Sequence, residues 1–402
     1  MRKVLVVAMA GLLLAAFSGT ALAAEKVRLG LITPLTGTLS FGGNEVKNGV
    51  SLAIEEKKTL FGKEIELVVA DAPDSTAAVA EMERLHSREG LNVVFGGYGS
   101  ALEEAWQKVS EREKKLCLGV VNWSDKLTAG GLKYYYRFAA TVSMLSASLV
   151  DFLNKEAPAV LKKDKKDIIV VVVNGDLTSY VANPIIADLK KAGYTNITHE
   201  TYPSDLKDFT SLILKIRRAK PDILIPCQYT ADGMAFRRQM VAMDYEPAIA
   251  VGGGLIYDQP EFADLGPKGA DGILCTSFTN PAMNPNVAPG LREFQEKYTK
   301  RFGHPPLTHA LSGYAGAQTY LKVLEKAGSL DVDVVRKALA ETNIPEGETP
   351  AYWGMKFDET GQNVLARQGV VAQWKKGVYT VVWPAKFATD KLELPLKPFS
   401  KR

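Results

Sequence analysis

The stretch I-I-V-V-V-V at residues 168–173 decides the fold class of this chain. All six residues are apolar and β-branched, so a strand formed here has no polar face. Such a strand is typical of a parallel sheet that is covered on both faces. A turn begins at N-G-D, residues 174–176, and a helix is expected over residues 179–192. The stretch therefore predicts one β–α step of an α/β fold.

The same alternation extends in both directions from this strand. Before it, strands are expected over residues 27–32, 65–70, 93–95 and 117–121, and helices over residues 44–58, 75–89, 100–112 and 142–155. After it, strands at 196–201, 223–226 and 248–251 alternate with helices at 208–219 and 231–243. Alternating runs predict parallel sheets flanked by helices, and the restart near residue 167 predicts two Rossmann-like lobes.

The C-terminal part departs from this alternation. Helices are expected over residues 288–302, 309–327 and 333–341. Two β-rich pieces follow at residues 353–357 and 369–382. The second piece alternates around a turn at residues 375–377, which predicts a β-hairpin.

The first 23 residues have the pattern of a secretory signal peptide. Arg2 and Lys3 form a basic start, residues 4–17 form an apolar run, and Ala21 and Ala23 provide small residues at a cleavage site. The alternative is a membrane anchor, but that requires an apolar run of ~20 residues. We therefore predict export to the periplasm. The length of the remaining chain fits two domains.

Composition excludes several classes of function. Without the two positive charges of the signal, the formal net charge falls from +4 to +2, which gives no basis for binding nucleic acid. The four histidines are scattered, and His304 and His309 are interpreted as loop and helix-start residues. No metal site or cofactor is expected. For the three cysteines, a Cys227–Cys275 disulfide and buried free thiols both fit the sequence.

The loops that follow the strands hold the candidate binding residues. In open parallel sheets, ligands bind beyond the carboxyl ends of the strands. Aromatic and small or hydroxyl-bearing residues recur there, as expected for a small, partly apolar ligand. The candidates are Phe41, Tyr98, Ser100, Asn122, Trp123, Ser124, Tyr180 and Tyr229. Ser100 is expected to cap a helix whose N-terminus favours an anion, such as a ligand carboxylate. The alternative is that Ser100 is only a cap and the rings pack between the lobes.

No string typical of an enzyme occurs. The segment G-G-Y-G-S at residues 96–100 lacks G-x-G-x-x-G spacing, and Gly252, Gly253 and Gly254 are interpreted as a turn after a strand. G-x-S-x-G, H-E-x-x-H and G-K-[ST] are also absent. We therefore expect no catalysis, and an exported α/β enzyme is a remote alternative.

A series of strings, in order along the chain, resembles one family. They include V-R-L-G-L-I-T-P-L-T-G from residue 27, G-G-Y-G-S-A from residue 96, A-K-P-D-I-L-I from residue 219 and G-Y-A-G-A-Q-T-Y-L-K-V-L-E-K-A-G-S-L-D from residue 313. Together they resemble the periplasmic solute-binding proteins of branched-chain amino acid ABC transporters, which have the type I periplasmic binding fold. The resemblance implies lobes at residues 24–139 plus 276–345 and 140–275 plus 346–402, joined by a three-crossing hinge.

The resemblance also implies roles for individual residues. Ser100 matches a position that holds the ligand carboxylate, Phe41 matches the ring that covers the ligand side chain, and Tyr180 matches the ring that closes over it. Asp232 falls near the acidic group that receives an ammonium, although it fits a helix N-terminal charge equally well. Trp123, between Asn122 and Ser124, departs from the family pattern.

The expected ligand follows from these roles. A branched-chain or other hydrophobic or aromatic amino acid comes first. If Asp232 does not reach the ligand, a carboxylate without an amine, such as an aromatic acid, is the alternative. The resemblance implies delivery to a membrane ABC permease by a monomer, and a ligand-sensing receptor component is a second alternative.

Overall fold

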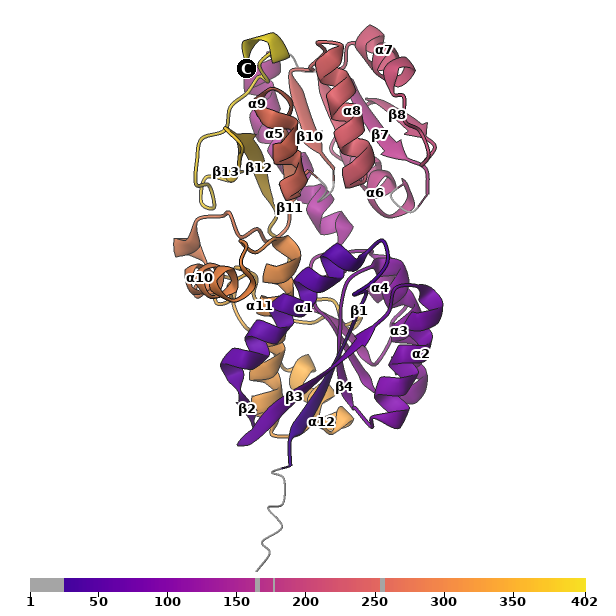
Figure 1. The fold of residues 1–402 in the computed structure, drawn as a ribbon, viewed down its shortest axis with the longest axis vertical. Coiled ribbons are helices and arrows are strands. Elements are labelled where there is room, and N and C mark those ends of the chain that lie inside the picture. The colour runs from indigo at the N-terminus through magenta and orange to yellow at the C-terminus, as the bar shows by residue number, and fades with distance from the viewer. Residues whose placement is uncertain (1–24, 163–166, 176–177, 254–256) are drawn as a thin grey trace, which may run out of the picture.

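A computed structural model describes residues 25–402, except residues 163–166, 176–177 and 254–256. The signal peptide expected over residues 1–23 lies outside the described residues. The described chain forms two α/β bodies that follow each other along the longest axis of the molecule, each built on its own sheet (Figure 1). Both sheets are mainly parallel, which confirms the predicted fold class.

The first sheet has the order β2-β3-β1-β4-β5-β6. Its strands are β1 (Val27–Thr33), β2 (Thr59–Leu60), β3 (Lys63–Asp71), β4 (Val93–Gly96), β5 (Leu116–Gly119) and β6 (Tyr135–Arg137). Only β2 runs antiparallel to its neighbour. Leu29 and Leu31 pack towards α1 (Ser40–Lys57), α11 (Thr308–Ala327) and α12 (Val332–Ala340), whereas Ile32 packs towards α2 (Ser75–Glu83) and α3 (Ser100–Glu113).

The second sheet has the order β13-β12-β11-β10-β9-β7-β8. Its strands are β7 (Asp167–Val173), β8 (Asn196–Tyr202), β9 (Ile223–Cys227), β10 (Ile249–Gly252), β11 (Leu274–Ser277), β12 (Val370–Lys375) and β13 (Val378–Trp383). Val170 and Val172 pack towards α5 (Val142–Leu161) and α6 (Asn183–Lys191), and Val171 packs towards α7 (Thr210–Ala219) and α8 (Thr230–Ala242). The stretch 168–173 is thus buried on both faces, as its composition predicts.

Shorter elements complete the described chain. They are α4 (Lys126–Ala129), α9 (Gly266–Ala270), α10 (Leu291–Phe302), the π-helical turns Arg84–Arg88 and Thr178–Ala182, and the 3₁₀ turns Pro260–Leu265, Pro285–Val287 and Phe399–Lys401. Strands β12 and β13 pair antiparallel, so the predicted hairpin is confirmed.

Two local expectations are wrong, and of the two alternatives for the cysteines the buried free thiols are confirmed. The helix expected over residues 75–89 becomes a π-helical turn after Glu83, and Asp74 caps its N-terminus by accepting from two backbone N–H groups at 2.9 Å. Residues 353–357 form only isolated bridges, at Met355 and Phe357. The three cysteines are free and buried, and β10 lies between the strands that carry Cys227 and Cys275.

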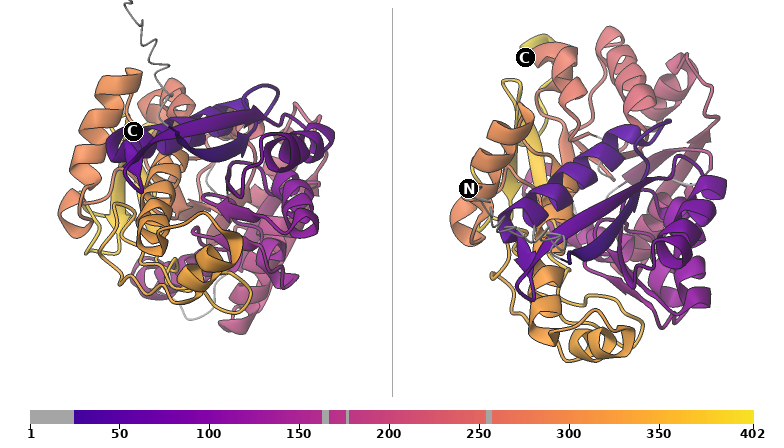
Figure 2. Two further views of the ribbon diagram at one scale, coloured as in Figure 1. Left: turned by 90° about the horizontal axis from the view of Figure 1, so that it is seen from below. Right: turned by 60° about the horizontal axis from the view of Figure 1, so that its bottom comes forward.

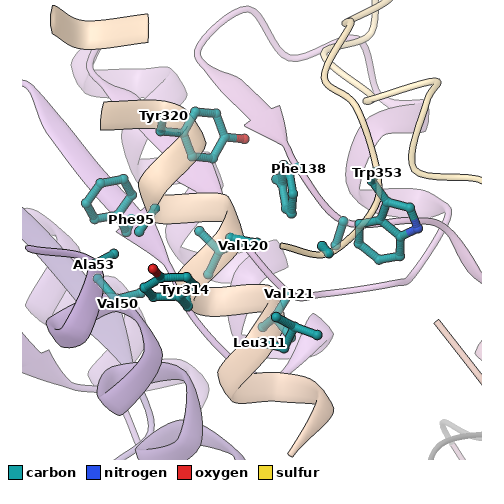
Figure 3. Close-up of a cluster of buried hydrophobic side chains, with 14 of the residues drawn as sticks. Val50, Ala53, Phe95, Val120, Val121, Phe138, Leu311, Tyr314, Tyr320 and Trp353 are labelled. Carbon is teal, nitrogen blue, oxygen red and sulfur yellow. The ribbon is translucent and has the colours of Figure 1, made fainter. Parts of the chain in front are cut away.

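Helices α1 and α11, far apart in sequence, form the core of the first body. Figure 2 shows the indigo N-terminal segment and the orange segment of α11 within one body from two further sides. Val50 and Ala53 of α1 lie beside Tyr314 of α11 in the buried cluster of Figure 3, and Leu311 and Tyr320 of α11 belong to the same cluster. A Cβ atom at Gly313 would lie 3.0 Å from the Val46 carbonyl oxygen, so the two helices approach closely.

The chain passes between the two sheets after β6, after β11 and before β12. The segment that precedes β12 packs against the end of the first sheet. Asn363 donates from Nδ2 to the Phe138 carbonyl oxygen at 2.9 Å, and Gln362 donates from Nε2 to the Ala139 carbonyl oxygen at 3.0 Å. These contacts fix residues 362 and 363 to the first body.

Candidate functional site

Three rings from the first body gather where its strands end. Tyr98 follows β4, and its backbone N–H donates to Thr33 Oγ1 at 3.3 Å. Its ring lies edge-on to His309, with centroids 4.7 Å apart. The Trp123 ring stacks on the His309 ring, with centroids 5.3 Å apart. It also contacts the Phe278 ring, with centroids 5.1 Å apart. The predicted loops after β4 and β5 therefore meet at the start of α11.

His309 carries the strongest unmet hydrogen-bonding capacity in this cluster. Its side chain is buried at 3% exposure, and neither ring nitrogen has a partner within the described part of the chain. Burial lowers the pKa of His309 to about 4, so the imidazole is neutral at pH 7. A neutral imidazole offers one donor and one acceptor to a group that enters beside Trp123.

Ser100 and Ser124 place two hydroxyls at the start of α3. The Ser124 backbone N–H donates to Ser100 Oγ at 3.4 Å. The Ser124 hydroxyl is buried and, among the residues described, finds no partner. The predicted N-cap is wrong, because Gly99 occupies that position with φ +100° and Ser100 is the first helical residue. The helix start with its free N–H groups still favours an anion at this point.

Asn122 stabilises the loop between β4 and α3 through hydrogen bonds. Its Nδ2 donates to the Gly97 carbonyl oxygen at 2.7 Å and to Glu103 Oε2. Both of its N–H donors are therefore committed within the protein. Burial raises the pKa of the Glu103 carboxyl to about 7, although Asn122 and other donors oppose that rise.

The buried Arg137 guanidinium fixes the loop's backbone. It donates to the carbonyl oxygens of Ser124 at 2.6 Å and Asn122 at 3.3 Å, and to Gln362 Oε1 at 2.7 Å.

The second body contributes residues from the ends of β9 and β10. Tyr229 begins α8 and is 48% exposed. Burial raises the pKa of the Tyr98 hydroxyl to about 12, with smaller contributions from Tyr229 and Asp258. Asp258 also contacts the first body directly, by accepting from Thr308 Oγ1 at 3.2 Å.

A cavity of about 450 Å³ opens beside this contact. Both bodies line it, with mostly apolar groups and a few polar ones. The lining residues are Asp258, Pro260, Ala263, Asn280, Pro281, Ala282, Gln295, Thr299, Pro305, Pro306, Leu307, Thr308, Trp374, Gly377, Val378 and Tyr379.

The sequence of almost the whole chain decides the family. Residues 26–378 match the profile of the periplasmic binding protein family. The "Leu/Ile/Val-binding protein homolog 7" of Brucella suis biovar 1 (strain 1330) is 32% identical over 389 residues, which cover 95% of this chain and 97% of that protein. The chain belongs to the periplasmic binding protein family.

Other relatives of this periplasmic binding protein agree. The "Leu/Ile/Val-binding protein homolog 8" of the same organism is 32% identical, with 97% and 98% of the two chains covered. The fold is similar to that of a leucine binding protein from Thermotoga maritima MSB8 (TM-score 0.74, 24% identity, 88% and 97% coverage). It is also similar to a solute binding protein from R. palustris in complex with benzoate (TM-score 0.74, 18% identity, 92% and 99% coverage). The family is one of solute-binding receptors that act outside the cytoplasm.

Within this periplasmic binding protein, the predicted site residues Phe41 and Tyr180 have different surroundings. Phe41 is 49% exposed at the start of α1, next to Gly42, where a Cβ would lie 2.6 Å from the Tyr98 ring. Tyr180 donates to Glu104 Oε1 of α3 at 3.4 Å, and the Lys126 ammonium lies 4.7 Å from its ring centroid. Tyr180 therefore joins the two bodies at a second point.

Asp232 has partners within its own body. Its carboxylate accepts from the Tyr202 hydroxyl, and burial raises its pKa while this bond and backbone N–H groups of the α8 start lower it. The sequence left two interpretations open, and these contacts are those of a helix N-terminal charge.

Sequence reasoning missed His309 and Asp258. His309 is at a helix start, as predicted, but nothing in its neighbourhood along the chain indicates the two rings around it. Asp258 could have been found by applying the strand-end rule to β10. Its partner Thr308, 50 residues further along, gives no such signal.

Proposed function

We propose that this protein captures a small carboxylate with an apolar or aromatic body between its two lobes and delivers it to a membrane ABC permease, without chemistry on the ligand. The unpartnered, buried hydroxyl of Ser124 beside Ser100 and the start of α3 carries this proposal. A carboxylate would satisfy that hydroxyl and lie at the positive end of the helix. The Trp123 and Tyr98 rings around His309 supply an apolar wall next to it.

Two ligand classes fit this arrangement. The names of the Brucella relatives favour leucine, isoleucine or valine, and the ring cluster extends this class to aromatic amino acids. The alternative is an aromatic acid without an amine. Asp232 already accepts hydrogen bonds from Tyr202 and from the α8 backbone, so its charge is stabilised without a ligand ammonium. This favours the aromatic acid.

We also propose the lobe division predicted from the sequence, with one adjustment. Lobe one spans residues 24–139 plus 276–345 and lobe two spans residues 140–275 plus 346–402. The contacts of Gln362 and Asn363 with residues 138–139 support a third crossing nearer residues 366–369. The ligand would then close the two lobes about these three segments. Cleavage of residues 1–23 and a periplasmic monomer complete the proposal.

Calorimetry tests the ligand class. The purified mature protein is titrated with leucine, isoleucine, phenylalanine, benzoate, glucose and putrescine. Binding of at least one of the four carboxylates supports the proposal, and binding of only the sugar or the polyamine contradicts it.

A pair of serine variants tests the carboxylate position. Ser124→Ala should weaken carboxylate binding about 10- to 100-fold, because a hydrogen bond to a charged group is lost. Ser87→Ala, an exposed serine of the first body, is the control and should change affinity less than about twofold. Equal affinities for Ser124→Ala and the parent protein would place the carboxylate elsewhere.

A further inference from the structure

Glu103 is a buried carboxyl behind the loops that carry Ser100 and Ser124. It belongs to the first turn of α3, and its side chain is fully buried. A Cβ atom at Gly96 of β4 would clash with Glu103 Oε1, and one at Gly119 of β5 would lie 2.8 Å from the same oxygen. Glycines at these two strand positions therefore leave room for the carboxyl between α3 and the sheet.

The Glu103 carboxyl has fewer partners than a buried charge needs. Its Oε2 accepts from Asn122 Nδ2, whereas Oε1 has no hydrogen-bond partner within the described part of the chain. A buried carboxylate with an unsatisfied oxygen is costly, and a proton removes its charge. Burial raises the pKa of Glu103 to about 7, against smaller effects of Asn122 and its other neighbours, so about half of the molecules carry this charge at neutral pH.

Other ionisable groups face this carboxyl from three elements. They are Cys117 of β5, Tyr135 and Arg137 of β6, and Tyr320 of α11. Burial raises the pKa values of the thiol and of both phenols above their ordinary values, so these groups are neutral near pH 7. Burial lowers the pKa of the Arg137 guanidinium, but an arginine keeps its charge in this range. Of these groups, Glu103 is the one that titrates near neutral pH.

The helix start that we propose for the ligand carboxylate is the one that carries Glu103. The Ser124 hydroxyl is buried without a partner among the described residues, and the Ser124 backbone N–H donates to Ser100 Oγ. Glu103 follows Ser100, the first residue of α3, by three positions. The partial positive charge of a helix start stabilises a nearby anion, but two carboxylates in one water-excluded region repel each other. A bound ligand carboxylate therefore favours the protonated form of Glu103.

Asn122 connects the Glu103 carboxyl to the backbone of both loops. Its Nδ2 donates to Glu103 Oε2 and to the Gly97 carbonyl oxygen at 2.7 Å, and Asn122 lies two residues before Ser124. Both the ionised and the protonated form of Glu103 offer Oε2 as an acceptor. A proton on Oε1 therefore changes the charge behind the loops and leaves their hydrogen bonds in place.

We propose that binding of a ligand carboxylate to the ionised protein is accompanied by the uptake of one proton by Glu103. The proton comes from the solvent and forms an O–H bond at Oε1, and nothing is oxidised or reduced. By linkage, the affinity for carboxylates rises as the pH falls and Glu103 becomes protonated before the ligand arrives. This inference rests on the proposed function, because it requires a ligand carboxylate at the start of α3.

Calorimetry measures the proton directly. Leucine, benzoate and 4-methylpentanoate, which has the carbon skeleton of leucine without the amine, are titrated in buffers of different ionisation enthalpy. The dependence of the binding heat on the buffer gives the number of protons taken up per ligand. For each ligand that binds, the parent protein should take up at least about 0.4 proton more than Glu103→Gln at pH 8, and the difference should be below about 0.1 at pH 6, where Glu103 is already protonated.

Glu103→Gln imitates the protonated side chain. Glutamine keeps an acceptor for Asn122 and carries no charge at any pH. At pH 8 the variant should bind carboxylates about five- to tenfold more tightly than the parent protein, and at pH 6 the two affinities should agree within about twofold. A purely structural role of Glu103 would instead weaken binding at both pH values. Glu113→Gln, at the other end of α3, is the matched control and should behave like the parent protein.

The outcomes separate this inference from the proposed function. If the parent protein binds carboxylates at pH 8 without proton uptake, the inference is wrong while the proposed function stands. The same holds if Glu103→Gln takes up as much proton as the parent, because another group, such as the buried Asp258 with its pKa raised to about 7, then receives it.

The parent protein alone decides if Glu103→Gln does not fold. Uptake at pH 8 that vanishes at pH 6 then supports the inference, and no uptake at pH 8 contradicts it. If the parent binds no carboxylate, the proposed function is wrong and the inference falls with it.

Discussion

At the scale of single residues, Arg137 connects stability to the site. Its guanidinium is buried and holds the carbonyl oxygens of Ser124 and Asn122. Arg137→Met would remove the charged donor from these oxygens and from the Gln362 amide oxygen and would leave the Asn122 carbonyl oxygen without this partner, so we expect a loss of about 3–5 kcal/mol in the free energy of unfolding. Urea denaturation measures this loss.

A surface arginine provides the comparison. Arg336 donates to the Lys133 carbonyl oxygen at 3.0 Å on the exposed side of the first body. Arg336→Met should cost less than about 1 kcal/mol, as exposed pairs do. Similar losses for the two variants would mean that Arg137 does not organise the loop.

Glu103 gives the protein a pH dependence with a definite sign. The pKa of its carboxyl in the folded protein, about 7, lies above the ordinary value of 4.5 because the carboxyl is fully buried. The folded state therefore binds the extra proton, and the stabilisation it provides is complete below pH 4.5 and lost as the pH rises through 7. Glu103→Gln removes this titration.

Unfolding of the parent and Glu103→Gln at pH 4.5 and pH 8 measures the effect. The stability of the variant relative to the parent should rise by about 3 kcal/mol between these two pH values. The buried histidines His86 and His309 titrate in both proteins, so they cancel in the difference. A difference that is constant with pH would show that folding does not change the pKa of Glu103.

The sequence could predict a site residue only where a pattern close to it along the chain indicates its position in the fold. Tyr98, Trp123 and Ser124 follow strands, and the strand-end rule alone brings them to one edge of a sheet. Their part in binding stays a prediction. His309 and Asp258 become notable only through contacts with residues far along the chain, which no local pattern contains.

At the scale of elements, hydrophobic patterning predicted the long strands and helices well. It failed at residues 353–357, where Met355 and Phe357 are apolar because they pack into the core of the first body and not because they pair in a sheet. It also missed the two-residue strand β2, since a run that short has no measurable period.

The crossing of α1 and α11 depends on glycine. A Cβ at Gly49 would clash with the Ala310 carbonyl oxygen and lie 2.9 Å from the Tyr314 backbone nitrogen. Gly49→Ala should therefore destabilise the protein by about 1–3 kcal/mol through overpacking, although alanine favours helices. Because α11 begins at Thr308 and His309, the shift should also weaken ligand binding.

Thermal unfolding and calorimetry check the Gly49→Ala prediction. Gly130→Ala at the end of α4, with no atom within 4 Å of the new Cβ, is the control and should be neutral or slightly stabilising. A stabilised Gly49→Ala protein would contradict the close approach of the two helices.

At the scale of the whole molecule, polar contacts between described residues join the two bodies at two places across the site. Thr308 donates to Asp258 on one side, and Tyr180 donates to Glu104 on another. A closed arrangement held by such contacts is only modestly favoured over an open one, since one hydrogen bond contributes about 1 kcal/mol net. The ligand would therefore supply most of the free energy of closure.

Removing the Thr308–Asp258 bond tests this balance. Thr308→Val keeps the shape of the side chain, so it should lower the closed population and weaken binding of every ligand by the same factor, about fivefold for 1 kcal/mol. Uniform weakening is expected for a closure effect, because the same population shift affects every ligand. Calorimetry with leucine and 4-methylpentanoate measures whether the two ligands weaken alike. Small-angle scattering should show a larger radius of gyration for ligand-free Thr308→Val. Thr201→Val, on the exposed side of β8, is the control and should match the parent protein. A selective loss of leucine alone in Thr308→Val would mean that Thr308 acts by orienting the Asp258 carboxylate, not by joining the lobes.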